Sequence, residues 1–113
     1  MAASIFFDDI SELGLESLLA IHDLSIKFSV SAKPAVSRFS LSIAPGECVG
    51  LVGESGSGKS LTALAIMQLL PVAARVNASS QVLFNDQDLL NYSSRQMRHI
   101  RGAKIGMIFQ DAM

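Results

Sequence analysis

A glycine-rich loop between an apolar run and a helical pattern constrains the fold of this chain most strongly. The run Cys48–Val52 is short, continuous and apolar, which predicts a strand buried on both faces. The loop that follows reads Gly53-Glu54-Ser55-Gly56-Ser57-Gly58-Lys59-Ser60. From Leu61 to Leu69 the apolar residues recur at helical spacing. We therefore expect a strand, a tight loop and a helix in immediate succession.

The residue types of this loop suit a crowded group of phosphates. Gly53, Gly58, Lys59 and Ser60 meet the pattern G-x-x-x-x-G-K-[ST]. Glycines let the backbone wrap closely, and successive N–H groups then form an anion nest at the positive end of the following helix. We expect Lys59 to reach the β- and γ-phosphates, Ser60 to ligate Mg²⁺, and the Glu54 carboxylate to face away. The loop predicts a nucleoside triphosphate site, for ATP with Mg²⁺, and its flanks disfavour an incidental glycine-rich turn.

Alternating apolar residues predict two strands before the loop. One covers roughly residues 19–30, and Phe39, Leu41 and Ile43 mark the other. Pro45-Gly46 predicts a turn after them. We expect residues 1–17 to form a poorly defined leader.

Further elements are predicted after the loop. Pro71 ends the first helix or closely follows its end, and residues 72–80 read as loop. Gln81–Phe84 predicts a short strand, and Ile105–Phe109 predicts the last one. Between them we expect a turn at Asn85-Asp86, a helix capped by Ser93 or Ser94, and a helix stop at Gly102.

Length and composition restrict the class of protein. The chain has 113 residues, half of them apolar, and a net charge of −1, which fits one small folded domain and gives no reason to expect nucleic acid as a partner. The longest apolar stretch, residues 61–76, is interrupted by polar residues and is too short to span a membrane. The N-terminus lacks the basic start of a secretory signal. The lone cysteine, Cys48, excludes an intrachain disulfide and is expected to be an inert buried thiol.

From Leu18 to Met113 the sequence resembles the N-terminal part of the ABC transporter ATPases. The stretch Ala44-Pro45-Gly46-Glu47 looks like the entry to their phosphate loop, and Ile105-Gly106-Met107-Ile108-Phe109-Gln110-Asp111 looks like their strand leading to the Q-loop. Within the family the similarity is greatest to importers of oligopeptides, dipeptides or nickel. The resemblance implies an α/β P-loop NTPase fold, with a small antiparallel β part followed by the beginning of a mostly parallel sheet with helices.

The resemblance also implies roles for single residues. Gln110 matches the Q-loop glutamine, which contacts Mg²⁺ and the attacking water and would act with Lys59 in catalysis; the plainer alternative is a polar residue at a strand end. Phe28 matches the aromatic that stacks on adenine, with core packing as the alternative. Ala112 stands where similar family members often have proline. The implied ATP contacts are Phe28, Gly53, Glu54, Ser55, Gly56, Ser57, Gly58, Lys59, Ser60 and Leu61.

Other family elements do not occur in these residues. The signature Leu-Ser-Gly-Gly-Gln, the apolar strand ending in Asp-Glu and the switch histidine are missing. Ile5-Phe6-Phe7-Asp8-Asp9 superficially resembles that strand but lies on the wrong side of the phosphate loop. We therefore expect residues 18–113 to be the N-terminal part of a nucleotide-binding domain, which binds ATP but hydrolyses almost none alone.

The resemblance implies partners and a location. The complete ATPase would energise transport of peptides or related small solutes, bound to transmembrane permease subunits at the cytoplasmic face of the membrane and paired with a second ATPase domain. Two alternatives remain at the level of the sequence. One is a different P-loop enzyme such as a small-molecule kinase, although two predicted strands precede the loop. The other is a truncated product without function.

A basic stripe follows the second predicted helix. Arg95, Arg98 and Arg101 are three residues apart and would share one helix face. A solvated face is the plainer interpretation, and contact with a partner or an anionic membrane is the alternative. Asp86 and Asp88 fit a turn and a helix start better than a metal site.

Overall fold

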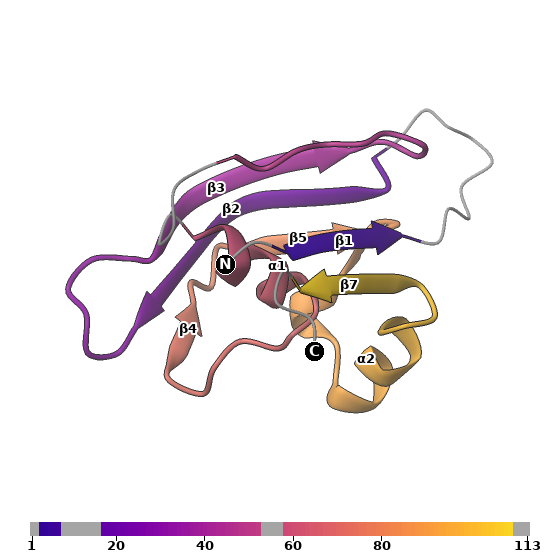
Figure 1. Ribbon diagram of the computed structural model, residues 1–113. Coiled ribbons are helices and arrows are strands. Elements are labelled where there is room, and N and C mark those ends of the chain that lie inside the picture. The colour runs from indigo at the N-terminus through magenta and orange to yellow at the C-terminus, as the bar shows by residue number, and fades with distance from the viewer. Residues whose placement is uncertain (1–2, 8–16, 53–57, 110–113) are drawn as a thin grey trace.

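The computed structural model describes residues 3–7, 17–52 and 58–109 (Figure 1). Most of its strands belong to one antiparallel sheet, and two short α-helices, α1 and α2, accompany them. The elements in chain order are β1 Ala3–Phe7, β2 Leu19–Phe28, β3 Val36–Ile43, α1 Lys59–Ile66, β4 Ala74–Val76, β5 Gln81–Phe84, β6 Gln87–Asp88, the 3₁₀ turn η1 Leu89–Asn91, α2 Ser94–Ile100 and β7 Ile105–Phe109.

The long strand β2 organises the main sheet. β3 pairs with one edge of β2 from Leu19 to Ile26, and two short strands share the other edge. β5 pairs with the first half of β2, from Leu19 to His22, and β4 pairs with its last residues, Ile26–Phe28. β4 lies in a segment that we expected to be a loop. Its three residues are too few to show alternation, and the free edge of β2 gives them their partner.

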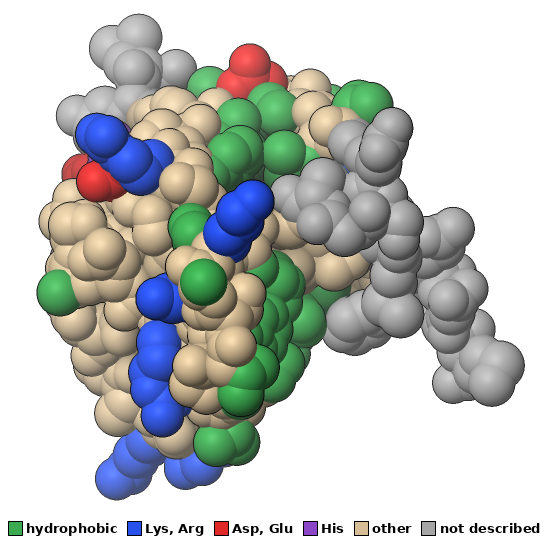
Figure 2. All heavy atoms as spheres, turned by 90° about the vertical axis from the view of Figure 1, so that its left-hand side faces the viewer, with side chains coloured by type: hydrophobic (Ala, Val, Ile, Leu, Met, Phe, Trp, Pro, Cys, Tyr) green, Lys and Arg blue, Asp and Glu red, His purple; other side chains and the backbone are tan. Residues whose placement is uncertain are grey.

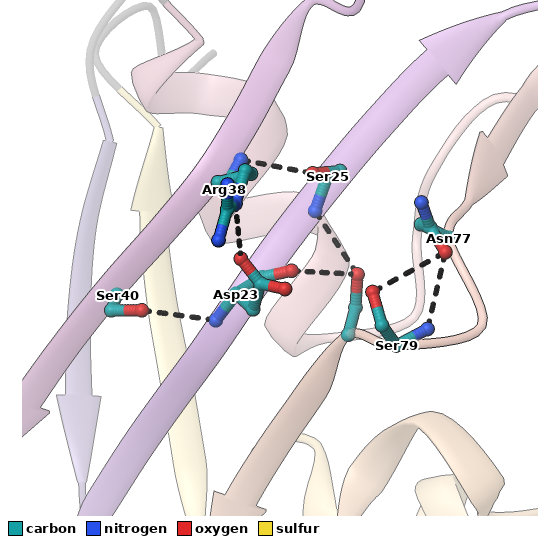
Figure 3. Close-up of polar contacts among 7 residues, drawn as sticks. Asp23, Ser25, Arg38, Ser40, Asn77 and Ser79 are labelled. Atoms are coloured by element: carbon teal, nitrogen blue, oxygen red, sulfur yellow. Dashed lines mark hydrogen bonds and ion pairs between the residues drawn. The ribbon is translucent and has the colours of Figure 1, made fainter.

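The β2–β3 ladder is interrupted at Asp23 and Arg38, which both have positive φ angles, of 53° and 49°. The register shifts on either side of Leu24, which marks bulges in the pairing. Side chains replace the lost backbone partners (Figure 3): the Asp23 N–H donates to Ser40 Oγ at 3.0 Å, and the Arg38 N–H donates to Ser25 Oγ at 2.9 Å. An exposed ion pair, Arg38 Nε to Asp23 Oδ1 at 3.1 Å, joins the two bulges.

Ser80 closes the gap between β4 and β5 on the other edge of β2. Its hydroxyl accepts from the Ser25 N–H at 3.0 Å and donates to the Asp23 carbonyl at 3.2 Å. The Asn77 N–H adds a third bond, to the Ser25 carbonyl at 3.0 Å. Ser80 is only 5 % exposed, so these bonds satisfy polar groups that water does not reach.

One face of the sheet and helix α1 form the hydrophobic core. The alternating residues Leu19, Ile21, Leu24 and Ile26 of β2 are at most 1 % exposed, as the sequence pattern predicted. The helix contributes its own apolar face and also contacts β1 and η1. Further members of the core are Leu18, Val36, Ala65, Ile66, Met67, Val82, Phe84, Leu89, Met97 and Ile105.

β1 and β7 form a separate antiparallel ribbon. Ala3 pairs with Phe109 and Phe7 pairs with Ile105. The strand β1 therefore occupies a segment that we expected to be a poorly defined leader. Because β1 runs opposite to β7, its carboxyl end lies away from Phe109, the residue before Gln110. This direction gives no support to a catalytic role for the segment that starts at Ile5.

The prediction of a buried strand at Cys48–Val52 is wrong. Residues 47–52 have no regular secondary structure, and Leu51 and Val52 are 42 % and 97 % exposed. A strand buried on both faces needs a paired neighbour and cover on each side. Within the described ranges, β7 takes β1 as its partner, and the single parallel pairing is the isolated bridge Arg101–Ile105. Cys48 is exposed, which also corrects the expectation of a buried thiol.

The predicted turns and caps are confirmed. Asn85 and Asp86 both have positive φ and join β5 to β6 as a two-residue hairpin turn. Ser93 caps α2 in a capping box with Gln96, and Gly102 has a φ of 78° just beyond the helix. Asp88 caps η1 by accepting from the Leu90 N–H at 3.1 Å, as its position at a helix start suggested.

Candidate phosphate site

The described part of the predicted phosphate loop is its end, where Gly58 caps helix α1. Gly58 has a φ of 95°, in the left-handed region that favours glycine. Its carbonyl accepts from the N–H and the hydroxyl of Thr62, both at 2.9 Å, which starts the helix. Gly58 has no side chain with which to cap the helix. Gly53, Glu54, Ser55, Gly56 and Ser57 lie outside the described residues.

Close packing gives a second reason for glycine at position 58. A Cβ atom there would lie 2.8 Å from Cγ2 of Val36 and 3.0 Å from the carbonyl oxygen of Ala35. Val36 opens strand β3 and is buried in the core, so neither group has free space in which to retreat. The end of the loop is therefore held against the start of β3.

Lys59 and Ser60 occupy the first turn of α1, and both are half-buried. The first turn carries no acidic residue, so no carboxylate of its own offsets the positive end of the helix. Leu61 is also in this turn, but its side chain packs against the core. Its backbone N–H is then the group it offers to an anion. The arrangement places backbone donors, an ammonium and a hydroxyl at one helix end.

Phe28 lies on the same face of the sheet as this helix end. β2 is regular between Ile26 and Phe28, so their side chains point to one face. Ile26 pairs with Val36, the residue that Gly58 touches. Phe28 is half-buried and is not a member of the core cluster formed by the described residues.

Gln110 lies outside the described residues, and β7 ends immediately before it at Phe109. The start of β7 is tied to α1 through Arg101. Nε and Nη2 of Arg101 donate to the carbonyls of Met67 and Gln68, at 2.7 and 3.2 Å, at the C-terminus of α1. Arg101 is thus no part of a solvated stripe, whereas Arg95 and Arg98 are exposed. No local sequence pattern signals this role, because the partners are more than thirty residues away.

The described residues contain no group of three or more His, Cys, Asp or Glu side chains that could hold a metal ion. A Mg²⁺ site built from Ser60 and Gln110 needs no such group, because it relies on one hydroxyl, one amide and the phosphates themselves. None of the described helices has the length and apolar character of a membrane span.

Comparison with known proteins decides the family. Residues 36–113 match the family model described as ABC transporter. The chain belongs to the ABC transporter family. As an ABC transporter ATP-binding chain it has the expected fold class, the N-terminal region of a P-loop NTPase, here an antiparallel sheet with two short α-helices.

Its relatives among the ABC transporter proteins are named for peptide-like substrates. The chain is 48 % identical over 99 residues to the dipeptide transport ATP-binding protein DppD of Escherichia coli, covering 86 % of this chain and 30 % of the relative. It is 44 % identical over 104 residues to the peptidoglycan transport ATP-binding protein YejF of Agrobacterium fabrum, covering 90 % and 19 %. Identity to the oligopeptide transport ATP-binding protein OppD of Bacillus subtilis is 41 % over 98 residues, covering 85 % and 27 %. The chain thus spans less than a third of the length of these ABC relatives.

Proposed function

We propose that this chain forms the phosphate- and adenine-binding part of an ATPase subunit that energises uptake of peptides. The observation that carries the proposal is the Gly58-Lys59-Ser60 end of the loop at the N-terminus of α1, in a chain of the ABC transporter family. The names of the relatives support the peptide class of substrate. The proposed partners are permease subunits in the membrane and a second ATPase domain, with the chain on the cytoplasmic side.

In the proposed site each group has one task. The loop from Gly53 to Gly58 surrounds the phosphates with backbone N–H groups, and the Lys59 ammonium neutralises the β- and γ-phosphates. The Ser60 hydroxyl and the Gln110 amide oxygen would hold Mg²⁺, which offsets charge on the transferred phosphoryl group. Phe28 would stack on adenine. In-line attack by water needs a general base, and we assign none to this chain.

Titration of the whole chain with MgATP tests the proposal. We expect Lys59→Ala to weaken binding by about tenfold or more, because it removes a charge-assisted contact to the phosphates. Lys104→Ala is the matched control, since Lys104 lies in the turn before β7, far along the chain from the loop. Equal affinities of the two variants for MgATP would refute the proposal.

The base contact is tested separately. Phe28→Ala should weaken MgATP binding by about 1–3 kcal/mol, the scale measured for aromatic–base stacking. Phe39→Ala is the control, because Phe39 packs against the core from β3. If Phe28→Ala lowers stability but leaves the affinity for MgATP unchanged, Phe28 packs in the core and does not stack on adenine.

A further inference from the structure

A pocket lies at one end of the main sheet, beside the turn at residues 29–35 and strand β4. It has a volume of about 370 Å³, within the range of small-molecule sites. Figure 2 views this end of the molecule and shows Lys and Arg side chains running down it, with acidic side chains only toward the upper edge. The residues that line the pocket include Ser25, Lys27, Ala32, Pro34, Arg75 and Asn77.

Two cations are paired directly across the strands in this pocket. Lys27 of β2 lies opposite Arg75 of β4 in the ladder. Like charges in that position destabilise a sheet. No described carboxylate forms an ion pair with either cation, and none lines the pocket. The sheet thus carries an uncompensated positive pair that a bound anion would stabilise.

The polar side chains beside Lys27 and Arg75 have hydrogen-bond donors that no described residue accepts. Asn77 Oδ1 accepts from the N–H and the hydroxyl of Ser79, at 3.2 and 3.3 Å, and Figure 3 shows its amide nitrogen pointing away from Ser79. Ser25 Oγ accepts from the Arg38 N–H. The acceptor atoms of both side chains are therefore engaged within the sheet, while the Asn77 amide group and the Ser25 hydroxyl hydrogen have no acceptor among the described residues.

The guanidinium of Arg75 is held in place by the backbone. Its Nη1 donates to the carbonyls of Val72 and Ala74, at 2.6 and 3.2 Å. Nε and Nη2 keep their hydrogens for another group, since no described residue accepts from them. The residues that line this pocket thus carry an ammonium, half of a guanidinium, an amide and a hydroxyl as donors, which is the set that a phosphate oxyanion needs.

We propose that this pocket binds a phosphate group, either free or carried on a small organic molecule. The site is distinct from the ATP site proposed above. Lys27 and Phe28 are consecutive residues of a regular strand, so their side chains point to opposite faces of the sheet. Phe28 lies on the face of Gly58, whereas Ser25, Lys27, Arg75 and Asn77 lie on the other; Val76, which also lines the pocket, packs against the core. ATP held by the phosphate loop therefore does not occupy this pocket.

The experiment uses the whole chain carrying Lys59→Ala, which weakens phosphate binding at α1. Inorganic phosphate is titrated against chloride at constant ionic strength, and the amide NMR signals of Ser25 and Asn77 are followed. We expect saturable shifts, and Lys27→Gln with Arg75→Gln should weaken the binding by about tenfold or more, the effect of losing two charge-assisted contacts. A matched pair on α2, Arg95→Gln with Arg98→Gln, should keep the affinity for phosphate within about twofold.

Two results would overturn the proposal. One is an absence of saturable shifts at Ser25 and Asn77. The other is equal weakening by the two double variants, which would reflect net charge alone. Folding of the Lys27/Arg75 variant is checked by its urea midpoint, because the change relieves like-charge repulsion but also removes the bonds from Arg75 to the Val72 and Ala74 carbonyls.

Two further measurements separate the ligand source and the two sites. Repeating the titration with glycerol 3-phosphate identifies the source, since tighter binding than inorganic phosphate indicates a phosphomonoester and equal binding indicates free phosphate. MgATP binding by Lys27→Gln with Arg75→Gln, in a chain that retains Lys59, should be unchanged. Failure of the ATP site is read from Lys59→Ala, and failure of this pocket from Ser25 and Asn77.

Discussion

Arg101 donates to the Gln68 carbonyl, and the Gln68 side chain in turn donates to the carbonyls of Leu89 and Tyr92, at 2.6 and 2.8 Å. Gln68 has a φ of 54° just after α1, where the chain leaves the helix. Together the two side chains fasten the end of α1 to η1 and to the turn before β7. The helix that begins at the phosphate loop is therefore connected to the strand that leads to Gln110.

Replacement of Arg101 tests this connection. Arg101→Met keeps the apolar stem but removes both bonds to the end of α1, and we expect it to lower the free energy of unfolding by about 1–3 kcal/mol. Arg98→Met is the control, because Arg98 is exposed on α2. Urea unfolding gives both values. Comparable losses in the two variants would show that the bonds to Met67 and Gln68 contribute nothing specific.

Gly58 is expected to tolerate no side chain. Gly58→Ala places a Cβ against Val36 and Ala35, at a positive φ that itself costs an alanine about 1–2 kcal/mol. Gly46→Ala is the matched control, since Gly46 also has a positive φ, of 76°, but nothing lies within 4 Å of an added Cβ. The difference between the two variants in thermal unfolding measures the contact with β3. A Gly58→Ala chain as stable as Gly46→Ala would mean that the loop end moves freely from Val36.

We expect the buried hydroxyl of Ser80 to contribute measurably to the free energy of unfolding. Ser80→Ala leaves the Ser25 N–H and the Asp23 carbonyl without this partner, at a cost of about 1–3 kcal/mol for buried polar groups. Ser37→Ala changes an exposed serine on β3 and should alter stability by less than about 0.5 kcal/mol. Denaturant midpoints compare the two, and near-neutral values for both would rule out a bridging role for Ser80.

Cys48 offers a direct check of the segment before the phosphate loop. Because Cys48 is exposed, a thiol reagent such as Ellman's should modify the native chain to completion, at a rate close to that of the chain in urea. Protection by more than about tenfold in the native state would indicate a buried thiol, and with it the buried strand that the sequence predicted.

Structural features that depend on local sequence, such as helix caps and turns, were mostly predicted correctly. The capping residue Ser93, the stop at Gly102 and the turn at Asn85-Asp86 depend on the preferences of single residues, and all are found. The alternation of apolar residues in β2 likewise predicted which face of this strand is buried. These features need no knowledge of distant neighbours.

Features that depend on distant partners were missed or mistaken. β4 forms because it pairs with a free edge of β2, and the sequence of its three residues does not predict this pairing. Cys48–Val52 has the composition of a buried strand but finds no pairing in the described structure. Lys27 and Arg75 are far apart in the sequence and become neighbours only through the register of β2 with β4. For the proposed ATP site, the sequence singled out Gly58, but its contact with Val36 could be found only from the fold.

The hydrogen bonds of Ser80 to β2 also limit changes in the length of the segment that connects β4 to β5. Surface connectors usually accept inserted or deleted residues. Here Asn77 and Ser80 each bond to β2, and the Ser80 N–H also bonds to the Asn77 carbonyl at 2.9 Å. An insertion between them would shift Ser80 away from Ser25. In natural variation or in loop engineering, this connector should therefore keep its length.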